Sequence, residues 1–191
     1  MGGALASALT DAGHQVVVAA SRAETAAQAA AGLDCEPAAS PAEAAAEADA
    51  VILAIPFTAG KEVADEIRDE VTGKPVIDVT NSPGVIETGT SNAEAFQGWL
   101  PEAHLVKAFN TVFASRLTEP TDGGEALDGF IAGDDASAKS TAATIVRDAG
   151  LAPLDVGGLK MARALEGMAW TNISLNMANK WPWHSAWKLA R

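Results

Sequence analysis

Short runs of branched apolar residues recur along the chain, and each ends abruptly in turn-forming or polar residues. Residues 51–55 and 76–79 are the most informative runs, because they stop at Pro56 and at Thr80-Asn81. A strand that is buried on both faces of a parallel sheet has this pattern. Ligands of parallel sheets bind beyond the carboxyl ends of the strands, so we expect a ligand at these positions.

Helical segments lie between the apolar runs and carry recognisable starts and ends. Ser40 followed by proline, and Ser91 followed by Glu94, are N-terminal capping patterns, while Asp135 caps a later helix that Gly150 ends. We expect helices at residues 1–12, 23–31, 41–48, 59–71, 91–100, 136–149 and 160–179. We expect strands at residues 16–20, 50–55, 75–79, 104–108, 129–132 and 152–156, a short edge strand near Cys35 and a flexible loop at 118–125.

This alternation of strand and helix predicts an α/β fold, a doubly wound Rossmann-type parallel sheet with helices on both faces. We divide the chain into a dinucleotide-binding domain at residues 1–156 and a C-terminal segment at residues 157–191. The second part holds the long helix and a tryptophan-rich tail, which we expect to pack on the first part or at a dimer interface.

Composition narrows the class of partner. The chain has 191 residues and a formal net charge of −12, which argues against a nucleic-acid partner because such partners need clustered Lys and Arg. Cys35 is the single cysteine, so an internal disulfide is impossible and a reducing cytoplasm is the simplest setting. The sequence offers neither a secretory signal nor an apolar run of the roughly 20 residues that cross a bilayer, so we expect no membrane partner.

The first residues are similar to the end of a phosphate-binding glycine loop. A dinucleotide fold opens with a strand and a Gly-x-Gly-x-x-Gly loop, and Gly2 fits the third glycine. The strand and the first two glycines would then precede residue 1. Loss of a central strand removes five or six buried side chains at about 1.5–3 kcal/mol each, so we expect residues 1–191 alone to fold and bind cofactor poorly. A true start upstream of Met1, or a chain that is a fragment, explains the missing strand better than a sheet that is reorganised around the gap.

Ser21 and Arg22 follow the strand at residues 16–20, where the residue that recognises the adenosine ribose is found. An NAD-binding site needs an acid there. A hydroxyl and a guanidinium instead suit a 2′-phosphate, which favours NADP over the alternative of an ordinary surface arginine.

With these residues in view, the chain resembles the NADPH-dependent coenzyme F420 reductases, the F420-dependent NADP oxidoreductase family. The matching stretches cover nearly the whole length and are residues 2–6, 13–14, 21–22, 54–57, 78–81, 106–111 and 133–135 and the C-terminal helix. The Lys-Ala-Phe-Asn-Thr run at 107–111 is the most specific of them. The resemblance implies hydride transfer between NADP(H) and a deazaflavin, without a metal and usually in a homodimer.

The resemblance also implies roles for individual residues. Ser21 and Arg22 would bind the 2′-phosphate. Ile55, Pro56 and Phe57 would line the path from adenosine to nicotinamide. Asn81 and Ala108 to Asn110 would lie near the nicotinamide.

Hydride transfer between two bound rings needs alignment and exclusion of water, and no protein nucleophile, so we assign no catalytic residue. Asn81 and Asn110 could hold the nicotinamide carboxamide or be ordinary turn residues. Lys107 lies within an apolar strand and either pairs with an internal carboxylate such as Asp78 or faces solvent from an edge strand.

Aromatic and sulfur-containing side chains gather in the last third of the chain. Trp170, Trp181, Trp183 and Trp187 could form a wall for a flavin-like ring, although we favour packing or a subunit interface. Trp99, Met161, Met168 and Met177 are expected in the core.

Other functions remain open. An imine or pyrroline carboxylate reductase would need a larger helical domain after the sheet. A metalloreductase of similar fold would need membrane helices. The sequence is also compatible with a regulatory module that senses NADP without turnover.

Overall fold

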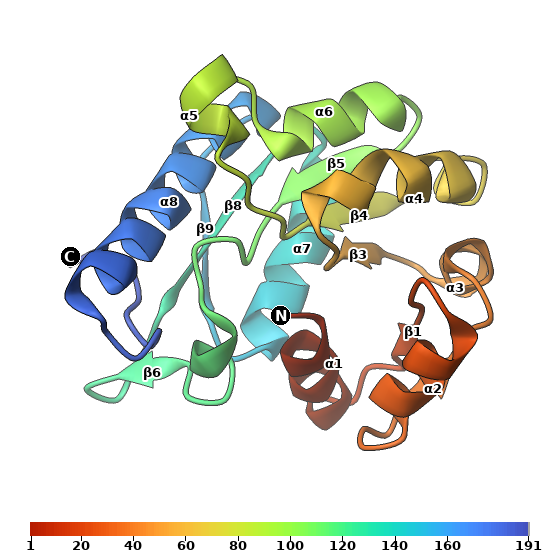
Figure 1. The fold of residues 1–191 in the computed structure, drawn as a ribbon, viewed down its shortest axis with the longest axis horizontal. Coiled ribbons are helices and arrows are strands. Elements are labelled where there is room, and N and C mark those ends of the chain that lie inside the picture. Colours follow the sequence, from red (N-terminus) through yellow and green to blue (C-terminus); the bar gives the residue numbers. More distant parts are fainter. Residues whose placement is uncertain (191) are drawn as a thin grey trace.

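The computed structural model describes residues 1–190, and its centre is a sheet of five strands (Figure 1). The strands stand in the order β3 (Val51–Leu53), β4 (Pro75–Asp78), β5 (His104–Lys107), β8 (Asp128–Gly133) and β9 (Ala152–Asp155). β3, β4 and β5 are parallel, and Ile52, Ile77 and Val106 stand in register across them. The doubly wound α/β architecture expected from the sequence is confirmed.

Two strands, β8 and β9, run against the expected direction. β8 is antiparallel to β5, with Lys107 opposite Ala132, while β9 returns parallel to β8. A parallel neighbour requires a crossover connection, usually a long helix. The chain between β5 and β8 contains only a short 3-10 turn, Ala114–Arg116, and a small hairpin, so it re-enters the sheet in the opposite direction. The expectation of a wholly parallel sheet is therefore wrong for β8 and β9, which both run opposite to β3, β4 and β5.

A second, two-stranded sheet stands apart from the first. It pairs β1 (Val17–Val18) in parallel with β2 (Glu36–Pro37), so the strand expected at residues 16–20 is only two residues long. Among the described residues β1 pairs only with β2, and β3 pairs only with β4. Val17 remains 37% exposed, whereas every residue of β8 is buried. The side chains of β1 are therefore not enclosed as those of a central strand would be.

Helices cover both faces of the main sheet because alternate residues of each strand point to opposite faces. On one face, Ile77 and Val106 belong to a cluster with apolar residues of α1 (Gly2–Asp11) and α7 (Ala136–Asp148). On the other face, their neighbours Val76 and Leu105 pack with α4 (Gly60–Ile67) and α6 (Asn92–Trp99). Helices α2 (Ala23–Ala30) and α3 (Pro41–Glu47) accompany the smaller sheet and the start of β3 (Figure 1).

Several local predictions need correction. The helix expected at 59–71 is a 3-10 turn, Phe57–Ala59, followed by α4, which ends at Ile67. The loop at 118–125 contains strand β6 (Thr121–Asp122), which pairs with β7 (Glu125–Ala126), because Gly123 and Gly124 both adopt the positive φ that a tight turn requires. A short helix, α5 (Gly84–Thr88), was not expected at all.

The C-terminal helix, α8 (Ala162–Asn179), is confirmed; it packs against β8 and β9 and lies near α5 (Figure 1). Met168 lies against a small cluster with Leu165, but Met161 and Met177 are exposed, so the prediction that they fill the core is wrong. Trp99 is half-buried and packs at the margin of the core. Within residues 1–190, α8 and all other helices fall short of the length and apolarity that crossing a bilayer demands.

Candidate functional site

The carboxyl ends of β3, β4 and β5 lie at one edge of the sheet, and the N-terminus of α1 lies beside them. A Cβ added at Gly2 would stand 3.4 Å from the Cβ of Ala54, the residue after β3. The first turn of α1 therefore approaches the end of β3 closely. A helix N-terminus that faces the ends of parallel strands is a favourable position for an anionic phosphate.

A pocket of about 320 Å³ opens beyond these strand ends. Its wall combines residues after β4 and β5 with Met1, one face of α8 and part of the C-terminal tail. The lining residues are Met1, Val79, Asn81, Asn110, Thr111, Val112, Phe113, Ala114, Ala169, Asn172, Ile173 and Trp183. Pockets of this size and mostly apolar lining are typical of small-molecule sites.

Asn81 and Asn110 form a reciprocal pair in this pocket. Asn81 Nδ2 donates to the Asn110 carbonyl oxygen at 2.8 Å, and Asn110 Nδ2 donates to Asn81 Oδ1 at 3.0 Å. Two buried side-chain oxygens, Asn110 Oδ1 and Thr111 Oγ1, have no hydrogen-bond partner among residues 1–190. Because buried polar atoms are normally satisfied, these two atoms are suited to bind polar groups of a ligand.

The backbone is strained at the same place. Phe109 has a φ of 59°, in the left-handed region that residues other than glycine rarely adopt, and its side chain is fully buried. This conformation turns the chain at the end of β5, between Ala108 and Asn110. Strain of this kind is concentrated at functional sites.

A network of buried charged side chains connects the ends of β4 and β5 to α8. Lys107 Nζ donates to Asp78 Oδ2 and to Glu166 Oε1, both at 2.8 Å, and to the carbonyl oxygen of Thr80. All three charged side chains are 0% exposed. The alternative of a solvent-facing lysine is therefore wrong, and the internal pairing with Asp78 is confirmed.

Glu166 connects this network to a second helix. Its carboxylate accepts from the backbone N–H of Asn92 at 2.8 Å, in the first turn of α6. Burial raises the pKa of Glu166, while Lys107 and the Asn92 N–H oppose that rise. Asn92 Nδ2 in turn donates to Thr80 Oγ1, so the turn that carries Asn81 is held from two sides.

Ser21 and Arg22 lie away from the pocket, at the end of β1 on the smaller sheet. Both are exposed, and Arg22 is the N-terminal cap residue of α2. Among the described residues, no side chain forms a hydrogen bond or ion pair with the Arg22 guanidinium. This group is therefore available to bind an anion.

The structure does not bring the predicted residues Ile55, Pro56 and Phe57, which follow β3, into the described lining of the strand-end pocket. Ile55 is half-buried and Pro56 is exposed. Phe57 stacks on Trp99 at 5.6 Å between ring centroids and meets Phe96 edge-on, so its ring contributes to the core cluster. Ala108, also expected near the ligand, is completely buried.

The structure thus brings together Asn81 and Asn110, which the sequence suggested separately. Sequence reasoning missed Thr111, Phe113, Asn172 and Trp183 as lining residues. Thr111 and the tryptophan-rich tail carried a signal, since the first ends the Lys-Ala-Phe-Asn-Thr run and the second offered an aromatic wall. Phe113 and Asn172 carried none.

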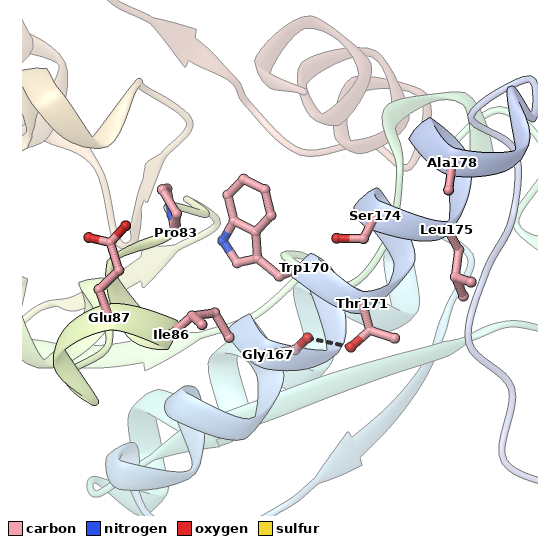
Figure 2. A pocket seen from close by; sticks show the side chains of 9 residues that line it. All are labelled: Pro83, Ile86, Glu87, Gly167, Trp170, Thr171, Ser174, Leu175 and Ala178. Carbon is pink, nitrogen blue, oxygen red and sulfur yellow. Dashed lines mark hydrogen bonds between the residues drawn. The ribbon is translucent and has the colours of Figure 1, made fainter.

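A larger groove of about 660 Å³ lies between α5 and α8. Figure 2 shows Pro83, Ile86 and Glu87 on one side and α8 on the other, with the Trp170 ring between them. Trp170 Nε1 donates to the carbonyl oxygen of Ser82, which fixes this indole against the chain after Asn81. The groove and the strand-end pocket therefore lie on different faces of α8.

The sheet, the glycine-bearing helix start and the pocket at the strand ends define a Rossmann-type dinucleotide-binding protein. Residues 1–82 match the model of a family described as NADP oxidoreductase, coenzyme F420-dependent. A solved structure of a candidate F420-dependent NADP reductase from Arthrobacter sp. FB24 superposes on this chain with a TM-score of 0.87 and 26% sequence identity. The superposition covers all of this chain and 94% of the Arthrobacter chain. The chain is similar to this family of NADP-dependent oxidoreductases, over residues 1–82 in sequence and over its whole length in fold.

Two further comparisons mark the range of related proteins. The metalloreductase STEAP3 of Rattus norvegicus is 35% identical over 105 residues, which are 53% of this chain and 21% of that protein. The chain thus spans about a fifth of the curated relatives it matches. Pyrroline carboxylate reductase of Plasmodium falciparum, solved with NADP bound, shares the fold at a TM-score of 0.64 and 15% identity, over 94% of this chain and 63% of its own.

Proposed function

We propose that the chain transfers a hydride between NADP(H) and a deazaflavin such as coenzyme F420, or a similar flat acceptor. The observation that carries the proposal is the Asn81–Asn110 pair at the strand ends, which leaves the buried Asn110 Oδ1 unpaired in a pocket of about 320 Å³. An amide N–H₂ of the kind that nicotinamide carries would satisfy this oxygen.

The free guanidinium of Arg22 supports NADP as the cofactor. Arginine binds phosphate oxygens through two parallel N–H donors, and Ser21 adds a hydroxyl beside it. No acidic residue occupies this position, so a ribose 2′-hydroxyl would lose the acceptor that an NAD site provides. In this proposal the pyrophosphate lies at the N-terminus of α1, near Gly2.

The chemistry requires little of the protein beyond placement. NADPH, when bound, supplies a hydride, that is, two electrons and one proton, and the acceptor takes a second proton from solvent. The chain holds both rings in contact, and the apolar pocket wall excludes water. In this proposal Asn81, Asn110 and Thr111 supply polar atoms to the pocket wall.

We further propose a homodimer, with the groove between α5 and α8 as the contact. Ile86 is 68% exposed at the edge of this groove, which Trp170 and Leu175 also line. A protruding apolar side chain beside an apolar hollow is self-complementary under a two-fold axis, because each copy inserts its side chain into the hollow of the other.

We also propose that the protein is cytoplasmic. The single thiol, Cys35, suits a reducing compartment such as the cytoplasm.

Two measurements test these proposals. The full-length protein is titrated with NADPH and NADH, and the NADPH complex is then mixed rapidly with coenzyme F420 while the absorbance of both compounds is followed. Saturable binding of NADPH and concerted loss of both absorbances support the function. Binding without turnover over a series of flat acceptors would indicate an NADP-sensing module instead. Light scattering on the chain and on Ile86→Glu tests the dimer, which the substitution should dissociate.

A further inference from the structure

The C-terminal tail, residues 180–190, turns back after α8 and runs along the loop that follows β5. Figure 1 shows this last segment leaving the end of α8 and returning toward β6. The reversal begins at Lys180, whose φ of 55° ends the helix in a left-handed conformation. Trp183 has the same kind of backbone, with a φ of 54°. Two such residues within four positions produce a tight turn at an energetic cost, and contacts must offset it.

The contacts that hold Trp183 come from the loop after β5. Ser115 Oγ donates to the Trp183 carbonyl oxygen at 2.6 Å. The indole meets the ring of Phe113 edge-on, with centroids 5.5 Å apart and planes at 78°. Arg116 Nη1 lies 2.6 Å from Nε2 of His184, the next residue. Trp183 is thus fixed by its ring, its carbonyl oxygen and its neighbour.

A second set of contacts joins the tail to the inner face of α8. Ser185 Oγ donates to Asn172 Oδ1 at 2.6 Å and accepts from Asn176 Nδ2 at 2.6 Å. Asn172 and Asn176 are both buried, and Asn172 also lines the strand-end pocket. Further along, the Leu189 N–H donates to Asp128 Oδ2 in β8. The tail is therefore attached at several points after Trp183.

Within the pocket, Trp183 and Phe113 provide the aromatic surface, and Asn81 and Asn110 provide polar atoms. Trp183 is 45% exposed although its backbone is held, so part of its ring is free to contact another molecule. Trp181, two residues earlier, is 43% exposed but does not line the pocket. The two tryptophans are almost equally exposed but differ in location, so Trp181 is a matched control for Trp183.

We infer that Trp183 is the ring-contacting residue of this pocket, and that it selects a flat heteroaromatic ring with an amide or carbonyl group. A large indole stacks favourably on such rings, and the unpaired Asn110 Oδ1 provides an acceptor for a donor on the ring edge. Nicotinamide and deazaflavin both belong to this chemical class. The inference rests on the proposed function, because that function brings such rings to the strand ends.

The experiment compares ligands that share the adenosine 2′-phosphate but differ in the ring. The probes are 2′,5′-ADP, which lacks nicotinamide, and NADPH; coenzyme F420 is added to the 2′,5′-ADP complex as a second source of a flat ring. Intrinsic tryptophan fluorescence and calorimetry are recorded for the wild type, Trp183→Ala, Trp183→Phe and the matched control Trp181→Ala. Melting curves establish that each variant is folded.

We expect ring-dependent quenching in the wild type and in Trp181→Ala, and its loss in Trp183→Ala and Trp183→Phe. Trp183→Ala should weaken the binding of NADPH by roughly 2- to 12-fold and leave the affinity for 2′,5′-ADP unchanged. Trp183→Phe should recover most of the affinity for NADPH. Quenching by NADPH alone assigns the ring to the cofactor, and quenching by F420 alone assigns it to the acceptor. Either result supports the inference.

The inference and the proposed function fail in different ways. If both nucleotides bind but the Trp183 variants are quenched as the wild type is, Trp183 does not contact the ring. Equal losses in Trp181→Ala would also overturn the inference, since they would reflect the tail as a whole. If the folded wild type binds neither nucleotide, the proposed function fails and Trp183 loses its role with it.

Discussion

Lys107 and Glu166 are 59 residues apart in the sequence and form an ion pair of 2.8 Å in which neither side chain is exposed. The pair joins the last residue of β5 to the second turn of α8. Asp78 joins the same ammonium group from β4, also at 2.8 Å. One cation thus compensates two buried carboxylates and holds the strand ends and α8 in a fixed arrangement beside the pocket.

Lys107→Met should be severely destabilising. It leaves Asp78 and Glu166 buried without a cation, and removing one partner of a buried pair costs about 3–5 kcal/mol. Glu166→Gln should cost less, about 1–3 kcal/mol, because the amide oxygen still accepts from Lys107 and one buried charge is removed. Urea unfolding of both variants measures the difference. Equal losses would mean that the shape of the cluster, and not its charge, is decisive.

Most of the alternation of strands and helices could be predicted because its signals are local. Capping patterns at Ser40, Ser91 and Asp135 correspond to side-chain caps in the structure. The direction of β8 could not be predicted, since it depends on the path of the chain from residue 108 to 127 and not on the strand's own residues. Helix α5 was missed because its five residues are too few to produce a periodic pattern.

The site was predictable at the strand ends and not beyond them. Asn81 and Asn110 follow apolar runs, so topology alone brings them to one edge. Lys107 remained ambiguous because the sequence does not reveal that Glu166, on the last helix, reaches it. Trp183 could not be placed in the pocket, since its position depends on a chain reversal at Lys180, a residue type that rarely adopts a positive φ.

Gly129→Ala should destabilise the fold through a steric clash. A Cβ at this buried position in β8 would overlap Val146 Cγ1 in α7, and overpacking of this kind costs about 1–3 kcal/mol. Val146→Ala removes the clashing atom. The double variant should therefore lose less stability than the sum of the two single variants, as a denaturation cycle would reveal. Strict additivity would show that the helix shifts away instead.

Glu94 should make the protein sensitive to acid. Arg163 donates to both its carboxylate oxygens, at 2.7 and 2.8 Å, and together with the Ser91 cap lowers the pKa of Glu94 to about 2 from 4.5. A carboxyl with a lowered pKa in the folded state stabilises the protein fully above pH 4.5 and loses that contribution as the pH falls toward 2. Because the Arg163 side chain is 41% exposed, solvent screens the ion pair and its contribution to stability should be small.

Glu94→Gln is the test of this acid sensitivity. The variant should be less stable than the wild type at neutral pH, and the difference should shrink as both are titrated from pH 4.5 toward 2. Unfolding by urea at a series of pH values gives the comparison. A difference that stays constant down to pH 2 would assign the effect to the capping hydrogen bond alone.

Arg22→Ala should change which nucleotide the protein prefers. If the guanidinium binds the 2′-phosphate, its removal eliminates a charge-assisted hydrogen bond and weakens the binding of NADPH by roughly 10- to 150-fold. NADH has no such phosphate, so its affinity should change less than about twofold. Arg68→Ala is the matched control, because Arg68 is also exposed but pairs with Asp65 on α4. Calorimetric titration of both nucleotides into the three proteins decides the matter: an Arg22 variant that still discriminates as the wild type does would show that the 2′-phosphate is recognised elsewhere.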